Sequence, residues 1–319
     1  MHEFELINNY FSKLSKNNKF ALDLNDDVFF DNKKGTIISV DTYNIGNHFI
    51  NFKHPNLVVK KILRSSISDL ICKGVIPKFY FISGSGNKKT LSKINLNKIS
   101  KSLKEEQKKY KIKLSGGDTT YSNKLSFTIT TLGYSNKIIL RNNAKLNDDI
   151  YVTGNLGDSF IGLKILQKKI KIKKKLTNYF INKYYKPDIQ FNLTKHLLNL
   201  ANTSIDISDG LVSDLEKMLN KQDFSFYLNL NKIPISKQLT NIIKIKNLKK
   251  TNLISNGDDY QVLFTASPKK ARIVGNLSKI LGIKISKIGK ITSSKKKSVI
   301  IDEKGMQIAL KNKGYIHHF

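Results

Sequence analysis

The sequence is short of cysteine and of long apolar runs, and each shortage excludes a class of protein. Cys72 is the only cysteine among 319 residues, which excludes an internal disulfide and a cluster of metal-binding thiolates. No apolar run approaches the ~18 residues that a membrane-spanning helix needs. The first residues, MHEFE, lack the pattern of a secretory signal peptide. We therefore expect a cytoplasmic protein without a membrane partner.

Arginine is nearly absent, although the chain is strongly basic. The formal net charge is +32, yet only three of the 56 basic residues are arginines: Arg64, Arg141 and Arg272. A protein that reads nucleic acid is expected to use arginine for bidentate contacts with guanine and phosphate. The lysines are instead scattered along the chain. This distribution indicates a genome-wide compositional drift, with the lysines lying on solvated surfaces. A basic nucleic-acid-binding protein remains an alternative, which salt-dependent DNA retention without ATP turnover would favour.

Glutamate is also scarce, so the acidic residues are mostly aspartates. The chain has 24 acidic residues, of which 18 are Asp and 6 are Glu. Nine of the aspartates lie in short turns, mostly with apolar flanks: Asp26, Asp27, Asp41, Asp69, Asp118, Asp206, Asp209, Asp258 and Asp259. Two carboxylates ~4 Å apart repel each other by ~4 kcal/mol at an effective dielectric constant near 20. If these turns converge in space, cations must lie among them.

The order of apolar segments predicts a mixed α/β (α+β) protein large enough for two domains. Strands are expected at residues 36–40, 75–82, 125–132, 150–153, 224–230 and 261–265, and helices at 1–20, 96–110, 211–219 and 268–281. Asp41 would lie at the carboxyl edge of its strand. A further helix is expected to begin at Pro55 and to end at Gly74. The residue pattern of the sequence changes at Arg141. We therefore expect the domain boundary near residue 140, giving domains 1–140 and 141–319.

Two stretches suggest a binding site for a metal ion or another ligand. Residues 114–120, LSGGDTT, combine two glycines with Asp118, an arrangement that suits a metal ion holding a phosphate, although by itself it also fits an ordinary turn. In the helix after Pro55, Ser65, Ser66 and Asp69 share one small polar face. An aspartate on a packed helix face is unfavourable unless it binds something.

Taken in order, the motifs resemble those of one enzyme family. The set is DD at 26–27, S-x-D-T and G-x-HF at 39–49, SDL at 68–70, GGDTT at 116–120, R-x-x-A-K at 141–145, YVTG-x-x-GDS at 151–159, IDISDGL at 205–211, GDDY at 257–260 and a closing GY…HF. It resembles the thiamine-monophosphate kinases, which belong to the aminoimidazole-ribonucleotide-synthetase-like ATP-binding superfamily. The resemblance covers nearly the whole chain. It implies a two-domain fold whose N-terminal domain pairs in a homodimer, with nucleotide bound near the interface.

The resemblance also implies roles for particular residues. The implied magnesium contacts are Asp26, Ser39, Val40, Asp41, Asp69, Asp118, Asp206 and Asp209. The implied nucleotide contacts are Gly117, Asp118, Arg141 and Ser208, and the implied substrate contacts are His48, Asp258 and Tyr315. The chain departs from the family pattern at Asn25, where glycine is usual, at Val40 in place of Thr, at Arg64 in place of a small residue and at Asp258 in place of Glu.

The function that this resemblance implies is transfer of the γ-phosphoryl group of ATP to thiamine monophosphate, forming thiamine diphosphate. Several Mg²⁺ ions would assist, and no general base is expected. The alternative within the superfamily is another ATP-using enzyme. Some of its members use a reactive cysteine near the N-terminus or at the C-terminus, whereas Cys72 is predicted inside a helix and the chain ends at Phe319.

Overall fold

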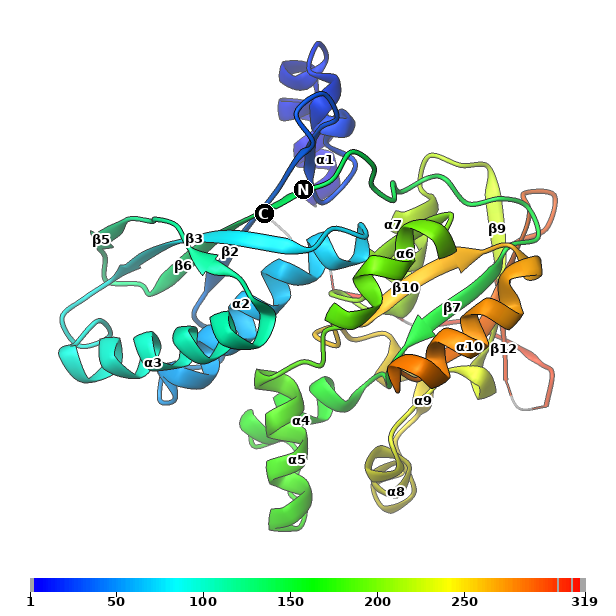
Figure 1. Ribbon diagram of the computed structural model, residues 1–319. Helices are drawn as coiled ribbons and strands as arrows, with labels where there is room; N and C mark the ends of the chain where they lie inside the picture. The colour runs from blue at the N-terminus through cyan, green and yellow to red at the C-terminus, as the bar shows by residue number, and fades with distance from the viewer. Residues whose placement is uncertain (1–2, 303, 311, 316–319) are drawn as a thin grey trace.

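The computed structural model describes residues 3–302, 304–310 and 312–315. Within these ranges the chain forms two sheets (Figure 1), one from residues 29–134 and one from residues 149–308. The expected domain boundary near residue 140 falls in the connection between them. The closing pair His318-Phe319 of the motif set lies outside the described residues.

The N-terminal sheet has the strand order β1-β2-β6-β3-β4, and β5 also pairs with β3. Its strands are β1 (Phe29–Asp31), β2 (Thr36–Asn44), β3 (Pro77–Gly86), β4 (Lys113–Leu114), β5 (Thr119–Tyr121) and β6 (Ser126–Tyr134). Helices α2 (Pro55–Cys72) and α3 (Lys93–Tyr110) lie on one face of this sheet (Figure 1).

The segment before β1 is helical, as expected, but broken into short turns. It comprises α1 (Glu3–Leu6), η1 (Ile7–Phe11), η2 (Ser12–Ser15) and η3 (Lys19–Leu24). Leu22 and Asp23 inside the last of these have positive φ angles, which interrupts regular helix geometry. This segment projects from the body near the junction of the two sheets (Figure 1).

The C-terminal sheet has seven strands in the order β13-β12-β9-β11-β7-β10-β8. They are β7 (Asp149–Thr153), β8 (Thr203–Asp206), β9 (Phe224–Asn229), β10 (Val262–Ala266), β11 (Ile285–Ser293), β12 (Val299–Ile301) and β13 (Gln307–Ile308). The helices of this half are α4 (Asp158–Leu166), α5 (Lys174–Tyr185), α6 (Thr194–Leu200), α7 (Leu211–Leu219), α8 (Lys237–Lys246), α9 (Lys250–Ile254) and α10 (Ala271–Leu281), with 3-10 turns η4 (Phe191–Leu193), η5 (Leu230–Lys232) and η6 (Pro268–Lys270).

One sequence expectation about position is wrong. Asp41 does not end its strand, because β2 continues to Asn44 and pairs antiparallel with β6 along its full length, Asp41 lying opposite Ile129. The strand is prolonged by this pairing, which no local pattern reveals. Asp41 therefore projects from the interior of a strand, on the same face as Ser39 and Tyr43.

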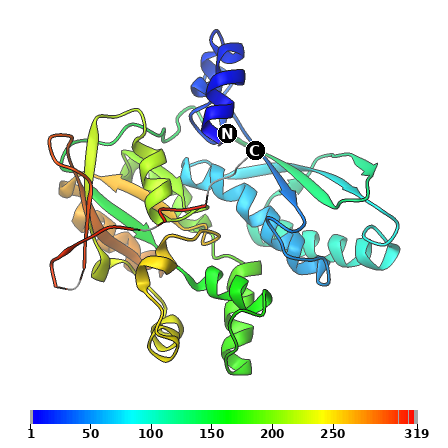
Figure 2. The same ribbon diagram turned by 180° about the vertical axis from the view of Figure 1, so that it is seen from behind.

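Helix α2 joins the two halves of the molecule. Both views show it running from beneath the N-terminal sheet toward the C-terminal half (Figures 1 and 2). The largest core cluster contains Val59, Ile62 and Ile67 from α2 together with Tyr184 from α5 and Phe264 from β10. Nearly every residue of α2 is buried, including Lys61, Arg64 and Asp69. Buried charges need partners, and these partners form the site described below.

In the ranges that the structure describes, no helix is both long enough and apolar enough to cross a membrane.

Candidate functional site

A cavity of about 500 Å³ lies where the two halves meet. Its walls come from β2, α2, the turn before β1, the β8–α7 turn, the turn before β10 and the end of the described chain. The predicted site residues that line it are Asp26, Val40, Asp41, His48, Asp69, Arg141, Asp206, Ser208, Asp209, Asp258 and Tyr315. Motifs separated by up to 289 positions in the sequence, from Asp26 to Tyr315, thus share one cavity.

Three predicted residues do not line this cavity. Ser39 is buried beside it and donates a hydrogen bond from its Oγ to Asp69 Oδ2 at 2.5 Å. Gly117 and Asp118 are exposed at the edge of the N-terminal sheet, where the Asp118 carboxylate accepts from its neighbour, the Thr119 N–H, at 2.8 Å. The expectation that Asp118 meets Asp41, Asp69 and Asp209 in one site is therefore not met within a single chain.

Close backbone packing requires glycine at position 117. The turn pairs with β3, with Ile82 N–H donating to Gly116 O at 3.1 Å and Gly84 N–H donating to Asp118 O at 2.9 Å. Gly117 has φ of 153°, and a Cβ there would lie 1.8 Å from Ile82 O. The glycine thus brings Asp118 to the sheet edge by main-chain geometry.

Three carboxylates of the cavity lining have no ion-pair partner among the described residues. Asp41, Asp69 and Asp206 come from β2, α2 and β8. None of them takes part in an ion pair recorded among the described residues. Hydroxyl groups orient them instead: Tyr43 OH donates to Asp41 Oδ2 at 3.2 Å, and Ser68 Oγ donates to Asp206 Oδ2 at 2.5 Å.

Burial and mutual repulsion disfavour the charged forms of these three carboxylates. Burial, with the neighbouring charges of Asp41, Asp206 and Asp27, raises the pKa of Asp69 well above its usual value. Burial is also the main reason that the pKa of Asp41 is raised, and burial together with Asp27 raises the pKa of Asp206 to about 7. A cation among these oxygens would remove the mutual repulsion.

The oxygen-only donor set suits Mg²⁺ chemically. As placed, however, no group of three or more His, Cys, Asp or Glu side chains in the described part of the chain is arranged to hold a metal ion. Asp41, Asp69 and Asp206 would have to draw together around the ion.

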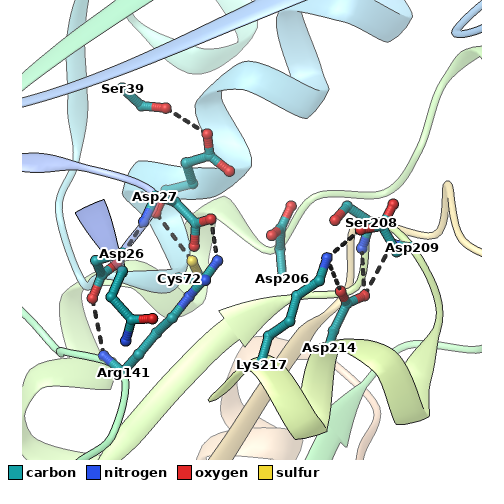
Figure 3. Close-up of polar contacts among 12 residues, drawn as sticks. Asp26, Asp27, Ser39, Cys72, Arg141, Asp206, Ser208, Asp209, Asp214 and Lys217 are labelled. Carbon is teal, nitrogen blue, oxygen red and sulfur yellow. Dashed lines mark hydrogen bonds and ion pairs between the residues drawn. The ribbon is translucent and has the colours of Figure 1, made fainter. Parts of the chain in front are cut away.

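A second group of charges lies beside the first, at the turn before β1. Asp26 and Asp27 face the guanidinium of Arg141, which pairs with Asp27 (Figure 3). The backbone N–H of Arg141 also donates to Asp26 Oδ2 at 3.0 Å. Lys73 extends into the same group, with Nζ 2.5 Å from Asp26 Oδ1. Burial would raise the pKa of Asp27, but the charges of Arg141 and Lys73 lower it below its usual value.

A third group is built on the β8–α7 turn. The Asp214 carboxylate accepts the N–H groups of Ser208, Asp209 and Gly210, each at 3.0 Å, and so holds the turn in shape. Lys217 pairs with Asp209, as Figure 3 shows. The backbone of Asp209 accepts the Tyr315 N–H at 3.0 Å. This turn therefore places the end of the described chain against the cavity.

Another part of the cavity lining holds His48 and Asp258, for which the resemblance implies substrate contacts. Asp258 has a left-handed backbone with φ of 68°, and its Oδ1 lies 2.8 Å from Lys61 Nζ and 3.1 Å from Tyr260 OH. The Lys61 ammonium also lies 3.6 Å from the centre of the Tyr184 ring. Tyr184 OH donates to the backbone oxygen of His48 at 3.1 Å. Asp258 and His48 are thus held from both halves of the molecule.

The side chains of Val40 and Cys72 are poorly placed for the roles considered for them, which are a metal contact and a reactive thiol. The Val40 side chain is 59% exposed and lies on the face of β2 opposite Ser39 and Asp41, so it points away from the Asp69 carboxylate. Cys72 is fully buried, and burial raises its pKa well above the usual value. A buried thiol with a raised pKa is a poor nucleophile, which argues against the alternative with a reactive cysteine.

Sequence reasoning missed the lysines of the site. Lys61, Lys73 and Lys217 contact carboxylates of the cavity, yet each is one of 53 lysines and carries no local mark. The carboxylate of Asp214, which holds the β8–α7 turn, was equally hard to assign. Only the spatial arrangement distinguishes these side chains from solvated ones.

Comparisons with known proteins agree with this arrangement. Residues 24–135 match the N-terminal domain, and residues 147–302 the C-terminal domain, of AIR synthase related proteins. A thiamine-monophosphate kinase of Buchnera aphidicola subsp. Schizaphis graminum is 37% identical over 323 residues, covering 99% of this chain and 98% of that protein. The thiamine-monophosphate kinase of Escherichia coli K12 is 32% identical, with the same coverage.

A solved structure shares the fold. The structure of AaThiL complexed with AMPPCP and TMP superposes with a TM-score of 0.85, at 24% identity, covering 99% of this chain and 97% of that one. At this identity the likeness shows the fold, which is the two-domain α/β fold of the AIR synthase related proteins.

Proposed function

The chain belongs to the thiamine-monophosphate kinase family, and on this basis we propose that it transfers the γ-phosphoryl group of ATP to thiamine monophosphate, giving thiamine diphosphate and ADP. The observation that carries the proposal is the group of Asp41, Asp69 and Asp206, which line the cavity. Two phosphate-bearing substrates can meet only where their charges are neutralised. We place this reaction in the cytoplasm, where ATP is available.

The carboxylates are proposed to serve through Mg²⁺. Bound by Asp41, Asp69, Asp206 and Asp209, Mg²⁺ would neutralise the phosphate oxygens of both substrates as they approach. Ser39 and Ser68 orient the Asp69 and Asp206 carboxylates by hydrogen bonds of 2.5 Å each. This hydroxyl support fixes which carboxylate oxygen faces the cavity.

Arg141 and Ser208 are proposed to bind the nucleotide. Arg141 is one of three arginines, and its guanidinium offers the planar set of donors that suits phosphate. Its Nε is buried and makes no hydrogen bond among the described residues. The Arg141 pair with Asp27 fixes one side of the guanidinium and leaves this donor for a ligand.

His48, Asp258 and Tyr315 are proposed to bind the acceptor. Asp258 and the nearby aromatic rings of Tyr43 and Tyr260 offer negative charge and π-faces, which suit the positively charged thiazolium ring of thiamine monophosphate. Asp258 is one methylene shorter than the Glu usual in the family. Lys61 and Tyr260 hold it in one position, so the shorter side chain keeps a defined direction.

We further propose that the protein acts as a homodimer paired through its N-terminal sheet. The face of this sheet away from α2 carries exposed apolar residues, Val40 and Tyr134 among them, and Leu114 and Tyr121 are exposed on its edge strands β4 and β5. Gly117 and Asp118 are exposed close to those strands. A second copy seated here would cover the apolar surface and bring Asp118 next to a nucleotide site.

The direct test is a reaction of purified protein with ATP, Mg²⁺ and thiamine monophosphate, in which ADP and thiamine diphosphate are both measured. We expect the two products in equal amounts and a loss of turnover with Asp69→Asn. The matched control is Asp302→Asn, which changes an aspartate outside the cavity. ADP release without thiamine diphosphate would contradict the proposal.

A further inference from the structure

Lys73 lies behind the cavity wall, in contact with Asp26, for which the family resemblance implies a metal contact. It follows the last residue of α2 and is fully buried. Its Nζ is 2.5 Å from Asp26 Oδ1, 3.7 Å from Asp27 Oδ2 and 3.3 Å from the backbone oxygen of Ser204. Oxygen atoms from two segments therefore surround one ammonium group.

The Asp26 carboxylate has almost no capacity left for another ligand. Its Oδ1 contacts Lys73 Nζ and also accepts the backbone N–H of Asp27 at 2.8 Å. Its Oδ2 accepts the backbone N–H of Arg141 at 3.0 Å. A carboxylate offers about four acceptor positions, and three of them are occupied by protein donors. Mg²⁺ binds oxygen at about 2.0–2.1 Å, so an ion on Oδ1 would lie against the ammonium.

The charges in this part of the cavity already balance. Asp26 and Asp27 carry two negative charges, and Lys73 and Arg141 carry two positive charges. The other carboxylates of the cavity differ in this respect. Asp41, Asp69 and Asp206 make no ion pair among the described residues. Figure 3 shows Asp26, Asp27 and Arg141 as one group, apart from Asp206 and from the turn that carries Asp209.

We propose that Lys73 is a built-in cation that takes the place of one divalent ion, so that Asp26 is not a metal ligand in this chain. The divalent ions are then restricted to the group around Asp41, Asp69, Asp206 and Asp209. Asp209 also pairs with a lysine, but the Lys217 side chain is partly exposed and can move aside, whereas Lys73 is fully buried. The inference rests on the proposed metal-dependent function, and it concerns only where the positive charge comes from. Lys73 acts as a positioning residue, since it fixes Asp26 and Asp27 and through Asp27 the Arg141 guanidinium.

The test counts bound Mn²⁺ per chain by equilibrium dialysis and by the electron paramagnetic resonance signal of free Mn²⁺. The variant is Lys73→Met, which removes the ammonium and keeps an unbranched side chain. We expect it to bind one more Mn²⁺ per chain than the unmodified protein, because Asp26 becomes available. Its melting temperature should also rise with added Mg²⁺ more than that of the unmodified protein.

The matched control is Lys61→Met. Lys61 lies in the same helix, is 1% exposed and pairs with Asp258, which is not a proposed metal ligand. Its removal should leave the Mn²⁺ count unchanged. A folded Lys73→Met protein with an unchanged count, or an equal gain in Lys61→Met, would overturn the inference.

A second variant decides the question if Lys73→Met does not fold. Asp26→Asn keeps the size of the side chain and one of its two hydrogen bonds to backbone N–H groups, because the amide has a single acceptor oxygen. We expect this protein to bind as many Mn²⁺ ions as the unmodified one, whereas loss of one ion would show that Asp26 is a ligand. Because these counts need no turnover, failure of the proposed kinase reaction would be seen separately.

Discussion

At the scale of single residues, the orientation of His48 bears on the chemistry. Its Nδ1 accepts the Asn44 N–H at 3.0 Å, and its ring packs edge-on against Tyr43 with centroids 5.5 Å apart. In a neutral imidazole whose Nδ1 accepts, the proton is on Nε2. The ring therefore presents a donor at its second nitrogen, which suits a phosphate oxygen and does not suit proton abstraction.

The acceptor phosphate needs no base in any case. A phosphate monoester is mostly dianionic at pH 7, because its second pKa is about 6. We predict that His48→Asn raises KM for thiamine monophosphate more than it lowers kcat, because the change removes a binding contact. Steady-state kinetics on the two proteins would measure this, and free thiamine should be a very poor acceptor, since its hydroxyl would have to lose a proton.

Two results would argue against this role of His48. A fall in kcat of about 10²–10⁴ with little change in KM is the signature of a lost general base. An unchanged KM with a lowered melting temperature would instead indicate a packing role, given the contacts of His48 with Tyr43 and Tyr184.

At the scale of elements, the packing of α2 on α3 explains why an arginine stands at position 64, where the family pattern has a small residue. Its Nε and one terminal nitrogen contact the two oxygens of Glu106 on α3 at 2.7 and 2.9 Å, and its other terminal nitrogen donates to Pro187 O at 3.1 Å. Both side chains are buried. The arginine is absent from the cavity lining, so this departure from the family pattern concerns the joint between α2, α3 and the segment after α5.

We predict that Glu106→Gln destabilises the fold and leaves the site chemistry unchanged. Removing one partner of a buried, bidentate ion pair strands the other charge, and the free energy of unfolding is expected to fall by about 3–5 kcal/mol. Denaturant unfolding followed by circular dichroism would measure the change. KM for both substrates should stay the same where the variant is folded.

A neighbouring ion pair provides the control for this prediction. Lys60 and Glu105 join the same two helices with Nζ 2.5 Å from Oε2, but Glu105 is exposed. Water screens such a pair, so Glu105→Gln should change stability much less than Glu106→Gln. Equal effects of the two substitutions would show that burial does not determine the strength of these contacts.

At the scale of the whole molecule, the position of Asp118 connects assembly to activity. Asp118 lies outside the cavity of its own chain, on a sheet edge with exposed Leu114 and Tyr121 nearby. If two copies pair through this sheet, Asp118 of one copy can reach the site of the other. Most homodimers have twofold symmetry, so the exchange would be reciprocal.

We predict that Asp118→Asn and Asp41→Asn are each inactive and that a mixture of the two regains activity after subunits exchange. In equal mixtures half of the dimers are mixed, and each mixed dimer keeps one complete site, so about a quarter of full activity is expected. The assay is turnover before and after exchange, with light scattering to measure the oligomeric state. A fully active monomer, or no recovery in the mixture, would refute the arrangement.

The sequence by itself determined which turns matter. The order of DD, SDL, GGDTT, IDISDGL and GDDY indicated the family and its two-domain α/β fold, and most strands and helices lie close to where apolar periodicity placed them. Such motifs are local, because a turn with glycine and aspartate needs only its own few residues to be recognised. The extent of β2 beyond Asp41 was not local, since pairing with β6 sets it.

Only the tertiary structure decided which charges meet. Lys73 and Arg141 oppose Asp26 and Asp27, whereas Asp41, Asp69 and Asp206 have hydroxyl partners and, in the described part of the chain, no cationic side chain paired with them. Gly117 and Asp118, prominent in the sequence, lie away from the cavity of their own chain. Electrostatic energy depends on distance and burial, and neither quantity can be read from the order of 53 nearly interchangeable lysines.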